Sequence, residues 1–219
     1  MLESIIPNLF VFYSSNQGSN AFLLAGKKTV LIDASDSGSS KTLLEELKKN
    51  GFEAENIDSI IFTHGHADHF TGAKAFPNAK LLMHKFDAEY VNSRDEMFTA
   101  SAILGSDYFP KIDSFLESGK TLDLKPFKLE VIHTPGHTKG SVCLFDRAKN
   151  LLFSGDTIFK DGVGRFDLPS GNRDDLEGSI NMLKGFEFET LLPGHGLIVK
   201  GSQSANIESA LKALSGSFI

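Results

Sequence analysis

Three histidines and an aspartate fall within six consecutive positions of this chain, and no other feature of the sequence constrains the fold as strongly. The block reads His-Gly-His-Ala-Asp-His over residues 64–69, and only Thr63 separates it from the apolar run of residues 60–62. Three of the seven histidines of the chain lie in it, which disfavours the alternative that they are ordinary solvated loop residues. Imidazole and carboxylate groups in such proximity are typical metal ligands. We therefore expect a metal site at the end of a strand.

The spacing within this block predicts two groups of ligands rather than one. Side chains at positions i and i+2 of an extended segment point the same way, so His64 and His66 can reach one ion. Asp68 and His69 lie past the expected end of the strand and turn towards another ion. The spacing therefore indicates a cluster of two metals.

Three further ligand-type residues follow strand-like runs later in the chain. His137 and His195 each stand in a Pro-Gly-His turn, and Asp156 follows the apolar residues 151–153 in a Ser-Gly-Asp turn. A single Pro-Gly-His is a weak signal, because Pro and Gly merely mark a turn. The complete order is more specific: the histidine block comes first, and a His, an Asp and a His follow it at strand ends.

In this order the residues resemble the metallo-β-lactamase superfamily, and the resemblance covers nearly the whole chain. It implies an α+β fold, the four-layer αββα sandwich, with the metal ligands gathered at one edge of the sheets. It also implies two divalent metal ions, with zinc as the first expectation and iron and manganese as compatible alternatives. The resemblance assigns the ligands by position: His64, His66 and His137 on one metal, Asp68, His69 and His195 on the other, and Asp156 between them.

The resemblance also sorts the remaining polar residues near these turns. Asp33, at the end of an apolar run, resembles the family's carboxylate that orients groups of the metal loop. His84 and His133 match no ligand position, and His133 is expected to be a hydrogen-bonded structural residue. We expect Asp68 and Asp156 to serve catalysis as well as metal binding.

The length and the hydrophobic pattern favour one domain over residues 1–219. A chain of 219 residues with 41% hydrophobic content suits a single core. Residues 93–118 lack a clear period and are expected to form an insertion or lid near the active site. We expect strands at 9–13, 21–25, 29–33, 58–63, 80–83, 121–124, 127–133, 140–146, 150–154 and 189–192, and helices at 40–50, 68–75, 85–92, 173–184 and 204–214.

Charge and targeting signals point to a small-molecule substrate in the cytoplasm. The net charge is −6 and basic residues form no block, which argues against a nucleic-acid partner. Residues 1–20 lack the pattern of a secretory signal, and no segment reaches the ~18 apolar residues of a membrane helix. The single Cys143 cannot form an internal disulfide and is expected to be a small buried residue. The sequence leaves the oligomeric state open.

Hydrolysis is the chemistry that a two-metal cluster favours. Ions ~3.5–4 Å apart share a water, and a single catalytic zinc already lowers the pKa of its water to ~7. A metal-bound hydroxide is then expected to attack a carbonyl, while the second ion stabilises the developing oxyanion. The chain contains no G-x-S-x-G elbow, Walker loop or complete G-x-G-x-x-G motif.

One segment narrows the substrate further. Residues 162–171 include Gly-Arg-Phe-Asp, which resembles the Gly-Arg-x-Asp segment of glyoxalase II-like hydrolases and persulfide dioxygenases. This resemblance implies that Arg165 binds a glutathione carboxylate, for which its planar fork is suited; the alternative is an exposed arginine in a glycine-rich turn. We therefore expect a thioesterase of the hydroxyacylglutathione hydrolase type that acts on S-lactoylglutathione.

Other members of the superfamily remain as alternatives. Persulfide dioxygenases hold one iron on the equivalents of His64, His137 and Asp156, and counting metals separates them from the two-metal hydrolase. Acyl-homoserine lactonases place a tyrosine where this chain has Phe159, and flavodiiron oxidoreductases usually have a glutamate in place of His66. Full-length glyoxalase II carries an additional helical domain, whereas only the helix expected at 204–214 follows His195 in this sequence. A non-catalytic metal-binding role is the remote alternative.

Overall fold

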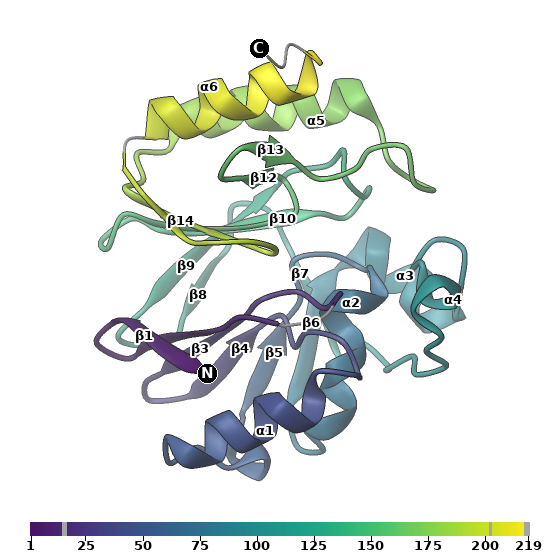
Figure 1. The fold of residues 1–219 in the computed structure, drawn as a ribbon, viewed down its shortest axis with the longest axis vertical. Helices are drawn as coiled ribbons and strands as arrows, with labels where there is room; N and C mark the ends of the chain where they lie inside the picture. The colour runs from purple at the N-terminus through teal and green to yellow at the C-terminus, as the bar shows by residue number, and fades with distance from the viewer. Residues whose placement is uncertain (15–16, 202, 217–219) are drawn as a thin grey trace.

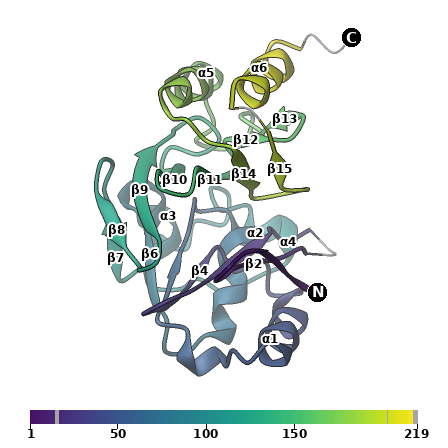
Figure 2. The ribbon, with the colours of Figure 1, turned by 90° about the vertical axis from the view of Figure 1, so that its left-hand side faces the viewer.

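Two β-sheets pack face to face in the computed structural model, and helices cover the outer side of each sheet (Figure 1). The structure describes residues 1–14, 17–201 and 203–216. Figure 2 shows the same four layers from the side, with α1 beneath the first sheet and α5 and α6 above the second. The arrangement confirms the αββα sandwich expected from the sequence.

The first sheet uses its strands in chain order and is half antiparallel and half parallel. Its first four strands pair antiparallel, and the pairs β4–β5, β5–β6 and β6–β7 are parallel. Parallel neighbours end at the same edge of a sheet, so the residues that follow β4, β5 and β6 lie together. The strands are β1 (Leu2–Ile6), β2 (Leu9–Phe12), β3 (Ala21–Ala25), β4 (Thr29–Ile32), β5 (Ser59–Ile61), β6 (Lys80–His84) and β7 (Ser114–Leu116).

The second sheet has the order β15-β14-β11-β10-β9-β8 and brings three further turns to one edge. The strands β11 and β14 are parallel, so the turns after them lie side by side. The connection from β9 to the antiparallel β10 joins them at that edge. The strands are β8 (Thr121–Asp123), β9 (Lys128–His133), β10 (Val142–Asp146), β11 (Leu151–Gly155), β14 (Thr190–Pro193) and β15 (Val199–Lys200), with a small hairpin of β12 (Ile158–Phe159) and β13 (Gly162–Val163).

Helices are short except on the two outer faces. Helix α1 buries Leu43 and Leu47 against the first sheet, has Lys48 and Lys49 in its last turn and ends before Gly51, whose φ is +83°. The helices are α1 (Ser40–Lys49), α2 (Ala67–Phe70), α3 (Lys85–Ser93), α4 (Ser101–Leu104), α5 (Arg173–Met182) and α6 (Gln203–Leu214), with 3-10 turns at η1 (Ala54–Asn56), η2 (Thr71–Ala75) and η3 (Leu183–Gly185). None of the helices within the described ranges is long and apolar enough to cross a membrane.

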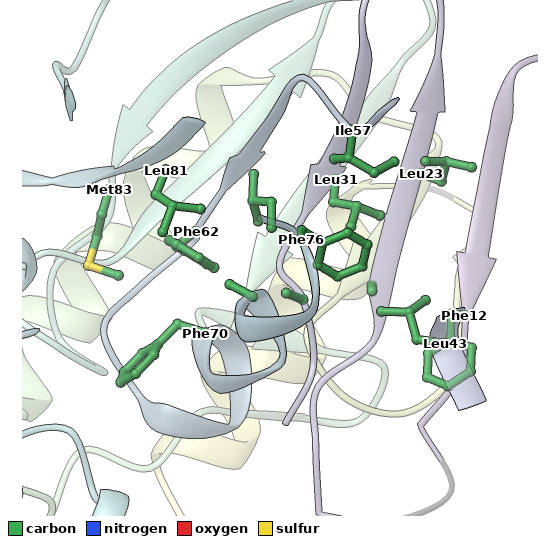
Figure 3. Packing of buried hydrophobic residues seen from close by; sticks show 14 of the residues in the cluster. Phe12, Leu23, Leu31, Leu43, Ile57, Phe62, Phe70, Phe76, Leu81 and Met83 are labelled. Atoms are coloured by element: carbon green, nitrogen blue, oxygen red, sulfur yellow. The ribbon is translucent and has the colours of Figure 1, made fainter. Parts of the chain in front are cut away.

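Three clusters of buried side chains fill the three spaces between the four layers. Successive residues of one strand enter different clusters: Phe22 and Leu24 of β3 face the second sheet, whereas Leu23 faces the helices of the first. This follows from the two-residue period of a strand. Figure 3 shows the helix-facing cluster, in which Phe62 and Phe70 meet edge to face at 6.4 Å. Strands buried on both faces explain the continuous apolar runs of the sequence.

The structure differs from the sequence-based expectation in several short strands. Strands β1, β7, β12, β13 and β15 were not expected. Strand β7 lies inside the region 93–118 and pairs with β6 as the last strand of the first sheet. It has only three residues, and Phe115 within it is 56% exposed, so it presents no alternating pattern. Edge strands of this length carry little sequence signal.

Candidate metal centre

Seven side chains meet at the edge where β5, β11 and β14 end, although they come from four separate turns of the chain. Within the described residues, three overlapping groups have ligand atoms within 4.8 Å of one another and could each hold a metal ion. All seven residues predicted as ligands from the sequence belong to them. The groups are His64, His66 and His137; His64, His69 and Asp156; and Asp68, His69 and His195.

The sequence suggested that the histidine block projects from an extended strand, but in the structure it does not. Strand β5 ends at Ile61, and residues 63–65 form a bend. The bend is fixed by Asp33, which accepts hydrogen bonds from the backbone N–H and the hydroxyl of Thr63, both at 2.8 Å. His64 and His66 therefore converge because the loop curves, and the two-residue alternation of a strand is not the cause.

The first group consists of three imidazoles whose nitrogens face one another. His66 Nδ1 lies 3.2 Å from His64 Nε2 and 2.9 Å from His137 Nε2, and the last two atoms are 3.1 Å apart. The outer nitrogen of His137, Nδ1, donates to the backbone carbonyl of Arg165 at 2.6 Å. This bond leaves Nε2 without a proton and turns its lone pair inward.

The tautomer of His64 is set by a relay through Thr63. The Thr63 hydroxyl donates to Asp33 Oδ2, so it can only accept from His64 Nδ1, which lies 3.1 Å away. Nε2 of His64 is then the nitrogen that carries the free lone pair. The hydrogen bonds of these outer atoms thus leave the inner nitrogens of His64 and His137 in the form that binds a cation.

The second group combines two histidines with the Asp68 carboxylate. His69 Nδ1 donates to Asp33 Oδ2 at 2.9 Å, which directs Nε2 towards Asp68 Oδ2 at 3.7 Å. His195 Nε2 approaches the same oxygen at 3.0 Å. The oxygen of Asp68 therefore faces both imidazoles of this group.

Asp156 faces both groups. Its Oδ1 lies 3.4 Å from His69 Nε2, and its Oδ2 lies 3.5 Å from His137 Nε2 and 3.6 Å from His195 Nε2. This is the position that the sequence-based expectation of a bridging carboxylate requires. The turn that carries Asp156 directly follows β11, between the turns of His137 and His195.

Unpaired buried atoms test whether this donor set fits a metal ion. His69 Nε2 and Asp156 Oδ1 are buried and lie 3.4 Å apart, and beyond this ion-pair contact neither has a regular hydrogen bond among the described residues. A buried polar group without a partner costs about 1–3 kcal/mol, so native proteins rarely leave two side by side. Both residues belong to the group of His64, His69 and Asp156, whose ligand atoms lie within 4.8 Å of one another. A divalent cation there would satisfy both, and mixed imidazole and carboxylate ligands suit zinc, iron or manganese.

The electrostatics of the cluster favour a cation as well. Burial, reinforced by the neighbouring His137, lowers the pKa of His66 to about 3, so the ring is neutral at ordinary pH. Burial alone would lower the pKa of His69, but the surrounding carboxylates of Asp33, Asp68 and Asp156 raise it well above its usual range. Three buried or half-buried carboxylates thus attract positive charge to this point.

One supporting residue escaped the sequence analysis. Asn20 is 4% exposed, and its side-chain amide donates to the carbonyls of Pro193 and Gly196 at 3.0 and 2.9 Å. Its backbone N–H donates to the carbonyl of Gly194 at 2.7 Å. Asn20 therefore fastens the turn that presents His195. No sequence signal reveals this role, because the partners are 173 to 176 positions away.

His84 and His133 lie outside the three groups, in agreement with the sequence-based expectation. Their rings stack at 4.3 Å, and His133 Nε2 donates to the carbonyl of Lys139 at 2.9 Å. His84 is 6% exposed, and its Nδ1 has no hydrogen-bond partner in the described part of the chain. Burial, with a smaller contribution from His133, lowers the pKa of His84 to about 4.

Replacing His84 with phenylalanine should make the metal-free protein less sensitive to acid. The unfolded state binds a proton on His84 below pH ~6.5, whereas the folded state does so only near 4, so folding free energy is lost as the pH falls between these values. At pH 5 the loss amounts to about 1–2 kcal/mol. Urea unfolding of both chelator-treated proteins at pH 8 and pH 5 measures it. Equal losses in the two proteins would contradict this prediction.

A hollow of about 290 Å³ opens over the cluster. Arg165 lies on its wall, as the sequence analysis expected of a substrate-binding residue, but its guanidinium pairs with both oxygens of the exposed Asp167 at 2.9 Å. Apart from Arg165, the residues around the metal groups are apolar or glycine. The lining consists of His66, Asp68, Ala100, His137, Asp156, Phe159, Val163, Gly164, Arg165, Leu168 and His195.

Comparisons with known proteins agree with this geometry. The model of the Metallo-beta-lactamase superfamily matches residues 16–195. A probable metallo-hydrolase of Methanocaldococcus jannaschii is 38% identical over 187 residues, which are 82% of this chain and 88% of the relative. The hydroxyacylglutathione hydrolase GloC of Haemophilus influenzae is 31% identical over 182 residues, which are 78% of this chain and 81% of that protein.

A solved structure with the same fold contains metal. The crystal structure of TTHA1623 in a di-iron-bound form superposes with a TM-score of 0.74 at 27% identity and covers 92% of this chain and 98% of that one. The residues matched by the superfamily model, 16–195, include all four turns that carry the seven residues.

Proposed function

The chain belongs to the metallo-beta-lactamase superfamily and is a metal-dependent hydrolase; from this premise we propose that it cleaves thioesters of the S-lactoylglutathione type. The proposed metal ligands are the seven residues of the three groups, with Asp156 between two ions. Divalent ions held there would supply Lewis acidity for a thioester carbonyl and would lower the pKa of water. The relative GloC, named as a hydroxyacylglutathione hydrolase, supports this choice of substrate.

The composition of the hollow is the observation that carries the proposal. Among the described residues that line it outside the metal groups, Arg165 alone is ionisable, so this part of the wall offers no separate general acid. A leaving group that departs without a proton fits such a site. A thiol has a pKa near 8.5, far below the pKa at which an alcohol or a neutral amine loses a proton. A thiolate can therefore leave without receiving a proton from the protein. Thioesters are therefore favoured over substrates whose leaving group needs protonation.

The protein residues have distinct tasks in this reaction. Asp68 is 21% exposed and borders the hollow, and His195 Nε2 holds its Oδ2 at 3.0 Å. Burial would raise the pKa of Asp68, but His69 and His195 lower it below the usual value, so the carboxylate is ionised and can accept the proton of the attacking water. Phe159, Val163 and Leu168 provide an apolar wall that excludes bulk water.

A second hollow, of about 450 Å³, supports a substrate larger than the acyl group alone. The segments that border the metal hollow border this one too: Lys139 lies two residues after His137, and Pro169 directly follows Leu168. Lys139 brings a positive charge, and Asp95 and Asp175 bring negative charges. Glutathione carries an ammonium group and two carboxylates, so Lys139 can pair with one carboxylate and an aspartate with the ammonium group while the thioester lies over the metal groups.

Replacing Arg165 with alanine should raise KM for S-lactoylglutathione about 2–5-fold and leave kcat nearly unchanged. An exposed ion pair contributes about 0.2–1 kcal/mol, and the backbone carbonyl that fixes His137 is retained. Asp167→Asn should have the opposite effect on KM, because it releases the guanidinium for the substrate. A neutral thioester without carboxylates is the control and should respond to neither change. A fall in kcat with unchanged KM would contradict the assigned role.

Parallel assays of the metal-loaded enzyme test the proposed substrate. We expect hydrolysis of S-lactoylglutathione that is lost on chelation and restored by metal. Hydrolysis of acyl-homoserine lactones but not of S-lactoylglutathione would show that the protein is a lactonase. Oxygen uptake with glutathione persulfide by protein containing one iron would make it a dioxygenase. A loaded protein that turns over none of these substrates would overturn the proposal.

A further inference from the structure

A further buried carboxylate, Asp87, lies against the loops that carry the three-histidine group. It belongs to the first turn of α3, which packs beside β6 and β7 (Figure 1). Its side chain is fully buried. It touches none of the seven proposed ligands, and sequence analysis gave it no role.

Asp87 joins the two loops that carry the three histidines. Its Oδ2 accepts the backbone N–H of Gly65 at 2.8 Å and the hydroxyl of Thr138 at 2.6 Å. Its Oδ1 accepts the backbone N–H of Gly140 at 2.6 Å. Gly65 stands between His64 and His66, and Thr138 follows His137. One carboxylate thus fixes the relative position of loops that are 71 residues apart in the sequence.

The two glycines allow both loops to approach this carboxylate closely. A Cβ atom at Gly65 would lie 3.0 Å from Asp87 Cβ, and one at Gly140 would lie 2.5 Å from Asp87 Oδ1. Neither glycine has a positive φ, so close approach, not backbone conformation, explains the residue type. The loops are therefore packed onto Asp87 and not merely within reach of it.

Asp33 provides the matching arrangement for the other side of the centre. It accepts from Thr63 and from His69 Nδ1, and His69 belongs to the group with Asp68 and His195. Asp33 also reaches His64, but only through the Thr63 hydroxyl. Asp33 therefore bonds His69 directly and supports the bend at His64, whereas Asp87 is the carboxylate that joins the loop of His64 and His66 to the loop of His137.

We infer that Asp87 is a positioning residue for one metal subsite: by holding Gly65, Thr138 and Gly140, it sets the mutual placement of His64, His66 and His137. The inference rests on the proposed ligand assignment. Asp87 acts through backbone and hydroxyl donors alone, and it therefore affects how tightly and in which order metal binds rather than the chemistry of the substrate. Partners of metal ligands typically contribute about 10–100-fold to metal affinity.

Zinc titration of Asp87→Asn, followed by NMR of histidines labelled with ¹⁵N, tests this inference. The chain has only seven histidines, so each ring can be followed. The amide keeps the shape of the carboxylate but turns an NH2 group towards the Gly140 or the Gly65 N–H. For Asp87→Asn we expect the resonances of His66 and His137 to report zinc binding that is about 10–100-fold weaker, while the affinity reported by His69 and His195 changes little. For Asp33→Asn we expect the opposite order: the affinity reported by His69 and His195 should fall more than the affinity reported by His66 and His137.

Asp146→Asn is the matched control for the loss of a buried carboxylate. Asp146 is 1% exposed and accepts the backbone N–H groups of Lys128 and Lys149, at the end of β10 opposite the edge that carries the ligand turns. Its replacement should lower the stability of the fold but leave the zinc affinity of both ligand groups unchanged. Thr138→Val provides a second test should Asp87→Asn fail to fold. It removes one donor to Asp87 and should weaken zinc binding at the three-histidine group several-fold. Thr138→Ser retains the hydroxyl and should bind zinc normally.

The outcomes separate this inference from the ligand assignment. If the unaltered protein binds no zinc, the ligand assignment fails. If it binds zinc at both groups and Asp87→Asn does so with unchanged affinities, only the role of Asp87 is refuted. Equal weakening of both groups by Asp87→Asn, or equal affinities in Thr138→Val and Thr138→Ser, would refute it as well.

Discussion

Replacing Asp156 with alanine should reduce hydrolysis at least about 10³-fold and lower the metal content together with it. Asp156 is the carboxylate that lies within 3.6 Å of ring nitrogens from both ligand groups, so its loss affects both proposed ions. Removing a single electrostatic contact to a reacting centre already costs about 10²–10³-fold in other enzymes. Elemental analysis and thioester assays on the same preparation measure the two effects.

His66→Ala and Asp146→Asn provide the comparisons for that result. His66→Ala removes a ligand of one group only, so metal content should fall to about one ion per chain. Asp146→Asn removes an equally buried carboxylate that lies outside the ligand groups and should retain metal and activity. Full metal content and activity in Asp156→Ala would refute the assignment of the bridging position.

Adding a single methyl group at Gly194 should also abolish activity. Gly194 precedes His195 in the turn after β14, and a Cβ atom there would lie 2.8 Å from His69 Cε1 and would overlap Asp156 Oδ1. The turn cannot withdraw, because the backbone of Gly194 is bonded to Gly155 and Asn20 at 2.8 and 2.7 Å. Gly194→Ala should therefore lower zinc affinity and hydrolysis by about 10²-fold or more, a loss of the size expected for a disrupted ligand.

Gly178→Ala makes the same chemical change where space is open. Gly178 lies within α5, and no atom lies within 4 Å of the position its Cβ would take. This substitution should stabilise the helix by about 0.5–1 kcal/mol and leave metal binding unchanged. Thermal unfolding and zinc titration of both variants make the comparison. Normal zinc affinity in Gly194→Ala would show that the turn is looser than its contacts indicate.

The sequence predicted the parts of the centre that obey local rules. Ligand-type residues follow apolar runs, and the resemblance to the metallo-β-lactamase superfamily implied that they gather at one edge of the sheets. Strand order accounts for part of this arrangement: the turns of Asp156 and His195 follow the parallel strands β11 and β14, which end at the same edge. The four layers follow from apolar runs that alternate with amphipathic helices. The sequence could not reveal the bend at residues 63–65, because Asp33 fixes it through hydrogen bonds from 30 positions away.

Long-range hydrogen bonds account for most of what the sequence missed. Asn20 and Asp87 are polar residues next to apolar ones, and nothing local distinguishes them from turn residues. Their roles arise from partners that only the folded chain brings near. The pairing of Arg165 with Asp167 was hidden for another reason: two neighbouring charges in a glycine-rich segment can face solvent or each other with similar energy.

Counting metal ions per folded chain tests the central claim most directly. The claim is that seven side chains from separate turns hold two divalent ions that the protein uses for hydrolysis. Elemental analysis of protein saturated with zinc and freed of excess should give two ions per chain, with thioester hydrolysis rising as the sites fill. A folded chain that retains no zinc, or that hydrolyses thioesters equally well after complete chelation, would contradict the account.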